Sequence, residues 1–107
     1  MTTGHFQRGA IYAATMPHIG TEKYFVVVSN NARNRRLETA LVARITSSQK
    51  PPISSIVPID GGEPVYGYVC CDDIELLYHE DCRQFVGAFS PPMMAKIGAG
   101  LRAALGL

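Results

Sequence analysis

Short apolar segments, separated by polar and turn-forming residues, fill most of the chain. Seven of them carry the β-branched and aromatic residues typical of strands, at 10–15, 24–29, 39–46, 53–59, 65–71, 74–78 and 83–89. The segment 24–29 (YFVVVS) is almost continuously apolar, which is typical of a strand buried on both faces. Pro, Gly and Asp between the segments mark turns.

The segment 39–46 (TALVARIT) alternates well enough to predict which side chains share a face. The period of two places Leu41, Ala43 and Ile45 on one face and Val42, Arg44 and Thr46 on the other. The stretch before it, 30–38 (NNARNRRLE), is polar and basic, and we expect it to form a loop.

The end of the chain has the spacing of a helix. Ser90 is suited to cap the helix N-terminus, and Pro91 suits the first helical position. Apolar residues then recur on one stripe, at Met94, Ile97, Leu101 and Leu105. Gly98 and Gly100 weaken this helix, so it must pack against the sheet or a partner. Many short strands followed by one helix predict a mainly β (α+β) fold, a small, partly closed antiparallel β-barrel with a C-terminal helix laid over it.

Composition places the chain among single globular domains. Its 107 residues are 47% hydrophobic and 18% charged, which fits one domain spanning 1–107. No run of about 18 apolar residues could cross a bilayer, and the N-terminus lacks the pattern of a secretory signal. We therefore expect a cytoplasmic protein without a membrane segment.

The cysteines predict no disulfide framework. Cys70, Cys71 and Cys82 are an odd number, which fits a reducing cytoplasm. Together with His79 they could form a zinc site, but structural zinc ligands favour paired spacings, and neighbouring strand residues point to opposite faces. We expect buried thiols instead, with no metal and no cofactor.

The net charge of +1 conceals a split between the two halves of the chain. Residues 1–50 hold seven Lys/Arg and two Asp/Glu, whereas residues 51–107 hold three Lys/Arg and seven Asp/Glu. The basic half predicts a single working face that includes Lys23, the 30–36 segment and Thr46. Cations among amides and hydroxyls suit a phosphodiester backbone, and the plainer alternative is a solvated basic loop. The candidate nucleic-acid contacts are Asn30, Asn31, Arg33, Arg35, Arg36, Arg44, Ser47, Ser48, Gln49 and Lys50.

Segments along nearly the whole chain resemble one known family. Residues 8–12 (RGAIY), 25–31 (FVVVSNN) and 43–49 (ARITSSQ) are similar to three motifs of the MazF/PemK family of toxin endoribonucleases. These are its R-G-[DE]-[IV]-[WY] opening, its V-L-V-V-S-N-D strand end and its V-x-L-T-S-Q segment. Further similar segments, at 56–60, 69–74 and 87–91, and the closing helix follow in the family's order.

The resemblance implies both a fold and an activity. Family members are SH3-like or CcdB-like β-barrels that form homodimers and cut single-stranded RNA at short sequences without a metal. The 2′-hydroxyl of RNA attacks the adjacent phosphorus, which leaves a 2′,3′-cyclic phosphate and a 5′-hydroxyl. The implied partners are RNA, a second copy of the chain, and a cognate acidic, MazE-like antitoxin that binds over residues 18–50. Thr21 joins the candidate RNA contacts.

The resemblance also implies roles for individual residues. The family's threonine at the end of the third strand matches Thr46. Its arginine falls on Lys23, which keeps the positive charge but loses the planar fork that grips two phosphate oxygens. Arg44, on the face of Thr46, could then supply the guanidinium. Glu22 is a candidate acceptor for the 2′-hydroxyl proton, and His18 is a candidate for proton transfer.

Other interpretations stay open. The departure at Lys23 also fits a CcdB-like toxin that is not an enzyme and poisons DNA gyrase through its C-terminal helix, or a barrel that has lost its activity and only binds an antitoxin.

Three tyrosines lie on predicted strands, which favours core or interface positions for them, with stacking on RNA as the alternative. They are Tyr12, Tyr66 and Tyr68.

Overall fold

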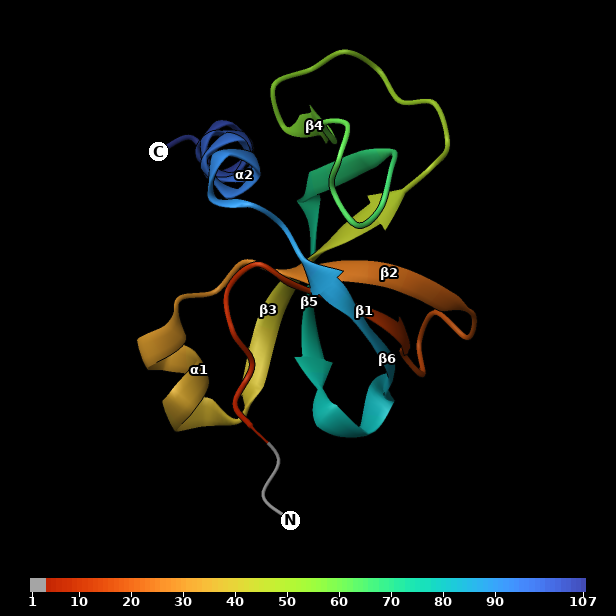
Figure 1. Ribbon diagram of the computed structural model, residues 1–107, viewed down its shortest axis with the longest axis vertical. Coiled ribbons are helices and arrows are strands. Elements are labelled where there is room, and N and C mark those ends of the chain that lie inside the picture. Colours follow the sequence, from red (N-terminus) through yellow and green to blue (C-terminus); the bar gives the residue numbers. More distant parts are fainter. Residues whose placement is uncertain (1–3) are drawn as a thin grey trace.

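The computed structural model describes residues 4–107 (Figure 1). The elements in chain order are β1 (Ala10–Thr15), β2 (Glu22–Val27), α1 (Asn31–Leu37), β3 (Thr39–Thr46), β4 (Ile56–Pro58), β5 (Tyr68–Tyr78), a 3-10 turn η1 (His79–Asp81), β6 (Cys82–Ala88) and α2 (Pro91–Leu105). The strands form one antiparallel sheet of order β4-β5-β3-β2-β1-β6. The expected β fold with a C-terminal helix is confirmed, but β4 and β6 remain edges and the sheet does not close into a barrel.

The predicted strands correspond to the observed ones with differences at their ends. The segments 10–15 and 39–46 are strands over those residues, whereas 53–59 contains a strand of only three residues. The segments 65–71 and 74–78 belong to one long strand, β5. Its pairing with β3 jumps from Ile74 to Cys70 between two consecutive β3 residues, so the intervening β5 residues form a bulge. That bulge is why the sequence pattern breaks there.

The expected loop at 30–38 is wrong, because Asn31–Leu37 is a helix. The side chain of Asn30 caps it by accepting a hydrogen bond from Arg33 N, and Glu38 ends it in the left-handed conformation with φ 56°. Asn34 is fully buried and bonds Ser29 through its amide, donating to Ser29 O at 3.0 Å and accepting from Ser29 Oγ at 2.6 Å. The helix is held by caps and polar contacts instead of an apolar stripe, so hydrophobic periodicity does not reveal it.

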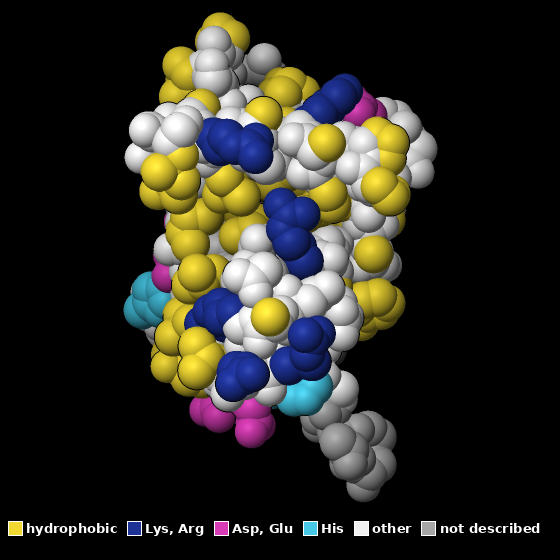
Figure 2. All heavy atoms as spheres, turned by 90° about the vertical axis from the view of Figure 1, so that its left-hand side faces the viewer, with side chains coloured by type: hydrophobic (Ala, Val, Ile, Leu, Met, Phe, Trp, Pro, Cys, Tyr) yellow, Lys and Arg dark blue, Asp and Glu magenta, His cyan; other side chains and the backbone are white. Residues whose placement is uncertain are grey.

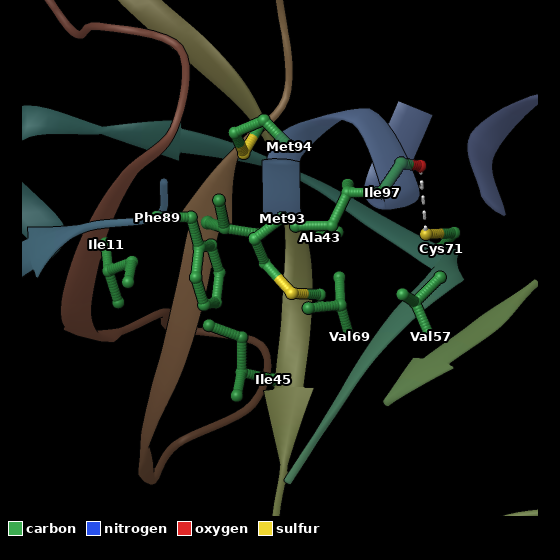
Figure 3. Close-up of a cluster of buried hydrophobic side chains, with 11 residues drawn as sticks. Ile11, Ala43, Ile45, Val57, Val69, Cys71, Phe89, Met93, Met94 and Ile97 are labelled. Atoms are coloured by element: carbon green, nitrogen blue, oxygen red, sulfur yellow. Dashed lines mark hydrogen bonds between the residues drawn. The ribbon is translucent and has the colours of Figure 1, made fainter. Parts of the chain in front are cut away.

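The sheet buries side chains on both faces. One face packs under α2 in a cluster of Ile11, Val26, Ala43, Ile45, Val57, Val69, Cys71, Phe89, Met93, Met94 and Ile97 (Figure 3). The other face holds Phe6, Ala10, Ala14, Met16, Phe25, Val27, Ala40, Val42 and Leu77. Consecutive residues of β2 therefore enter different clusters, which confirms the strand buried on both faces. Leu41 does not follow its predicted partners into the core and is 38% exposed.

Helix α2 begins as predicted, with Ser90 Oγ accepting from Met93 N. It lies beside β4 and β5, and Figure 1 places it at the opposite end of the long axis from α1. A Cβ at Gly100 would come within 2.5 Å of Val57 Cγ2, so this glycine permits close packing of the helix. The predicted stripe is buried only in its first half, and Leu105 is 63% exposed. Within residues 4–107, no helix combines the length and apolar character needed to cross a membrane.

Candidate active-site cleft

A cleft of about 530 Å³ opens where β2 begins and β3 ends. Its walls come from four parts of the chain, namely the β2 start, the β3 end with the two serines after it, the connection between β4 and β5, and one residue of β6. The lining residues are Glu22, Lys23, Tyr24, Arg44, Ile45, Thr46, Ser47, Ser48, Pro64, Val65, Tyr66 and Val86. Cations, hydroxyls, a carboxylate and aromatic rings therefore share one hollow.

Strand register brings Lys23 and Thr46 together. Tyr24 pairs with Ile45, and Lys23 and Thr46 are the next residues along the two antiparallel strands. Both line the cleft. Thr46 Oγ1 accepts a hydrogen bond from Ser48 N at 3.1 Å, which orients the hydroxyl and leaves its proton free to donate. A cation and an oriented hydroxyl at one strand end suit the oxygens of a phosphate group.

Arg44 lies on the wall of the same cleft with most of its bonding capacity unused. Its Nη1 is 3.8 Å from Asp73 Oδ2, a long ion pair between partly exposed groups. Among the described residues, its buried Nε has no hydrogen-bond partner. A guanidinium so weakly engaged within the chain can bind an anion with its planar fork.

The arginines of α1 do not join this cleft, which corrects the prediction of a single working face. Helix α1 joins the far ends of β2 and β3, near the pair Val27 and Val42. Lys23 lies four positions away from Val27 along β2, a distance of about 13 Å. Viewed from the side of the two helices, the molecule shows several Lys and Arg side chains among apolar patches (Figure 2).

Three residues of the 30–36 segment make structural contacts within the chain instead. Arg33 donates from Nη1 to Thr39 O at 2.7 Å and from Nη2 to Thr39 Oγ1 at 3.1 Å. Asn31 Oδ1 accepts from Arg8 N at 2.7 Å, and Asn30 caps the helix. Two further α1 arginines, Arg35 and Arg36, are exposed.

The remaining predicted site residues lie outside the cleft lining. His18 Nε2 is 3.0 Å from Glu75 Oε1, and the residue lines a different hollow beside Leu76 and Tyr78. The β1–β2 turn carries His18 toward β5, away from the end of β3. Three others, Thr21, Gln49 and Lys50, are exposed and do not line the cleft.

Sequence reasoning missed the wall made by Pro64, Val65 and Tyr66. Tyr66 is not in a strand, contrary to expectation, and its side chain is 81% exposed. The one local signal was Gly67, since an isolated glycine within a strand pattern often marks a close approach of two backbones. That glycine has φ 115° and lies directly against Thr46.

The cysteines lie buried or half-buried and do not line the cleft. Burial raises the pKa of the Cys71 thiol and of the Cys82 thiol to about 11. Cys71 Sγ donates to Ile97 O at 3.7 Å, and Cys82 Sγ donates to Tyr78 O at the same distance. Both thiols are therefore protonated near neutral pH. In the part of the chain from residue 4 onward, no group of three or more His, Cys, Asp or Glu is arranged to hold a metal ion.

Comparison with known proteins shows which family the chain resembles in sequence. Residues 7–105 match the family described as PemK-like, MazF-like toxin of type II toxin-antitoxin system. The chain is 34% identical over 100 residues to Endoribonuclease MazF4 of Mycobacterium tuberculosis (strain ATCC 25618 / H37Rv), covering 94% of this chain and 92% of the relative.

Solved structures agree with the family match. An endoribonuclease in complex with its cognate antitoxin, from a mycobacterial species, superposes with a TM-score of 0.87 at 33% identity, over 95% of this chain and 96% of that one. The MazE-MazF structure (Form-II) from Deinococcus radiodurans has a TM-score of 0.75 at 18% identity, over 98% and 99% of the two chains, and shares the fold. Fold, family model and sequence identity converge: the chain belongs to the PemK-like, MazF-like toxin family of type II toxin–antitoxin systems.

Proposed function

We propose that this chain is the endoribonuclease toxin of its system and that the cleft between the β2 start and the β3 end is its active site. The observation that carries the proposal is the meeting of Lys23, Arg44 and Thr46 in one hollow. Two cations and an oriented hydroxyl are suited to hold a phosphodiester and to stabilise charge on its oxygens in the transition state. The name of the M. tuberculosis relative as an endoribonuclease supports the same activity.

In the proposed reaction, the RNA supplies its own nucleophile. The 2′-oxygen forms a bond to the adjacent phosphorus as the bond from phosphorus to the 5′-oxygen breaks, which gives a 2′,3′-cyclic phosphate and a 5′-hydroxyl. Glu22 accepts the proton of the 2′-hydroxyl, and Lys23 donates a proton to the departing 5′-oxygen. Arg44 and the Thr46 hydroxyl hold the two non-bridging oxygens, with no metal and no cofactor.

The substrate is single-stranded RNA. Two serines of the cleft lie directly after Thr46, and Gln49 and Lys50 continue the exposed polar track beyond it. Together they extend the path of the RNA backbone away from the cut bond. Thr21 lies one residue before the cleft and extends that path on the β2 side. Arg35 and Arg36 form a separate contact at the α1 end.

The same surface suits an antitoxin. We expect a cognate acidic, MazE-like antitoxin to compete with RNA for the cationic residues within 18–50, in a homodimer acting in the cytoplasm. The solved mycobacterial complex pairs that endoribonuclease with its cognate antitoxin. Because the relatives are named as endoribonucleases, the gyrase-poisoning alternative is not favoured.

The direct test is incubation of the purified protein with single-stranded RNA in EDTA, followed by analysis of the product ends. We expect cleavage products with 5′-hydroxyl ends, and we expect Thr46→Ala to fold normally and not to cut. Products that end in 5′-phosphate would contradict the mechanism. Parental activity in Thr46→Ala would remove the role given to that hydroxyl.

A further inference from the structure

Tyr66 is a large aromatic side chain held out into water at the rim of the cleft. It is 81% exposed, against 41% for Tyr24, the other tyrosine of the cleft lining. A single exposed aromatic is common on protein surfaces and by itself needs no explanation. Its position on the wall beside Arg44 and Thr46 is what requires one.

The segment that carries Tyr66 is braced at both sides, although the side chain itself is free. Glu63 accepts from Ser90 N at 3.0 Å and from Ser90 Oγ at 2.5 Å, which fastens the segment to the start of α2. On the other side, Gly67 O accepts from Ile59 N at 2.9 Å, and the Gly67 backbone lies against Thr46. In Figure 1 the green connection between β4 and β5 returns beside the arrowhead of β3. The backbone that carries Tyr66 is thus fixed in position in advance of binding.

A second aromatic side chain lines the same cleft from β2. Tyr24 is 41% exposed and pairs through its backbone with Ile45, one residue before Thr46. The cleft therefore combines phosphate-binding groups at the strand ends with aromatic faces on two separate segments. Cations that follow a backbone and rings that stack on bases are the combination by which proteins bind single-stranded nucleic acid.

From this arrangement we infer that Tyr66 is a stacking platform for an unpaired nucleobase next to the cut bond, with Tyr24 contributing from the β2 wall. The inference rests on the proposed ribonuclease function and adds to it a residue that positions the substrate. Because every base has a stacking face, the platform holds a flanking base without reading its identity. Tyrosine suits this task because its side chain has few rotatable bonds, so ordering it on binding costs little conformational entropy.

The test pairs a protein change with an RNA change at the same contact. The cut site is first mapped with the parent protein, and the same oligonucleotide is then made with one abasic ribose at each flanking position. For the parent we expect one abasic position to lower kcat/KM about tenfold. Tyr66→Ala should lose about tenfold on the intact RNA and lose nothing further at that position, because the two changes remove one contact.

Two matched variants accompany it. Tyr66→Phe keeps the ring and should behave as the parent. Tyr78→Ala removes another exposed tyrosine, 47% exposed and outside the cleft lining, and should also behave as the parent. Thermal melting is expected to be the same for Tyr66→Ala and the parent, since the ring is in water. The inference is overturned if Tyr66→Ala cuts the intact RNA as well as the parent, or if its loss adds in full to the abasic loss at every position.

Failure of the proposed function is seen separately. If the parent cuts no RNA, stacking is still measured with single-stranded RNA that carries 2-aminopurine. Quenching by the parent and its loss in Tyr66→Ala would support the platform in a protein that binds RNA without cutting it. Equal quenching, or none with either protein, would overturn the platform as well.

Discussion

Gly67 and Thr46 pack backbone against backbone across the wall of the cleft. Gly67 has φ 115°, and a Cβ added there would overlap the carbonyl oxygen of Thr46. This contact joins the β4–β5 connection to the end of β3, so the residue with the candidate catalytic hydroxyl and the segment with the aromatic wall are positioned together. No side chain other than hydrogen fits between them.

Gly67→Ala should therefore damage both stability and activity. The strained φ and the overlap together should lower the free energy of unfolding by about 1–3 kcal/mol, and RNA cleavage should fall because Thr46 is displaced. Gly61→Ala is the matched control, since a Cβ at Gly61 meets nothing within 4 Å. Urea denaturation and a cleavage assay measure the two effects. Equal stability of the two variants would show that the backbone contact has no energetic importance.

Arg44 should matter far more for cleavage than the arginines of α1. Removing a guanidinium that stabilises the transition state should reduce kcat about 100-fold or more in Arg44→Ala, and Arg44→Lys should recover only part of this because it lacks the planar fork. The paired change of Arg35 and Arg36 to alanine should mainly raise KM and leave kcat near the parental value. A larger fall in kcat from the α1 changes than from Arg44→Ala would place the active site elsewhere.

Buried thiols predict a loss of stability at alkaline pH. Burial raises the pKa of Cys71 from 9.0 to about 11, so the folded state keeps the proton over a range in which the unfolded chain has lost it. The stabilising contribution is complete below about pH 9 and is lost as the pH rises to about 11. Urea midpoints measured across this range should fall, and less steeply in Cys71→Ala. Identical slopes in the two proteins would argue against a shifted thiol.

The polar anchor of α1 should be a stability element without a role in the chemistry. Asn34→Ala leaves the Ser29 groups without their buried partner, which should cost about 1–3 kcal/mol of unfolding free energy. The exposed change Arg35→Ala serves as the control and should alter stability little. Cleavage rates measured well below the melting temperature should match the parent for Asn34→Ala. A rate loss there without a stability loss would reverse this assignment.

Local patterns were sufficient for the elements that bury apolar side chains at regular spacing. The alternation of 39–46 predicts β3 and the shared side of Arg44 and Thr46 in the cleft, and Ser90 with Pro91 predicts where α2 begins. The sequence pattern did not predict helix α1, because this helix is stabilised by Asn34 and its caps and has no periodic apolar stripe. The long strand β5 was divided in two because its bulge interrupts the alternation at 71–73.

By itself, the sequence determined the strand-rich class, the C-terminal helix, the family resemblance and the candidacy of Lys23 and Thr46. Only the tertiary structure decided which candidates meet. Lys23, Arg44, Thr46 and Tyr66 line one cleft. His18 and the arginines of α1 lie on other parts of the surface. The physical reason is that strand register and the return of a connection over a strand end depend on contacts between distant residues. The spacing of residues along one strand or helix shows only which of its own side chains share a face, and does not show which distant segments lie beside it.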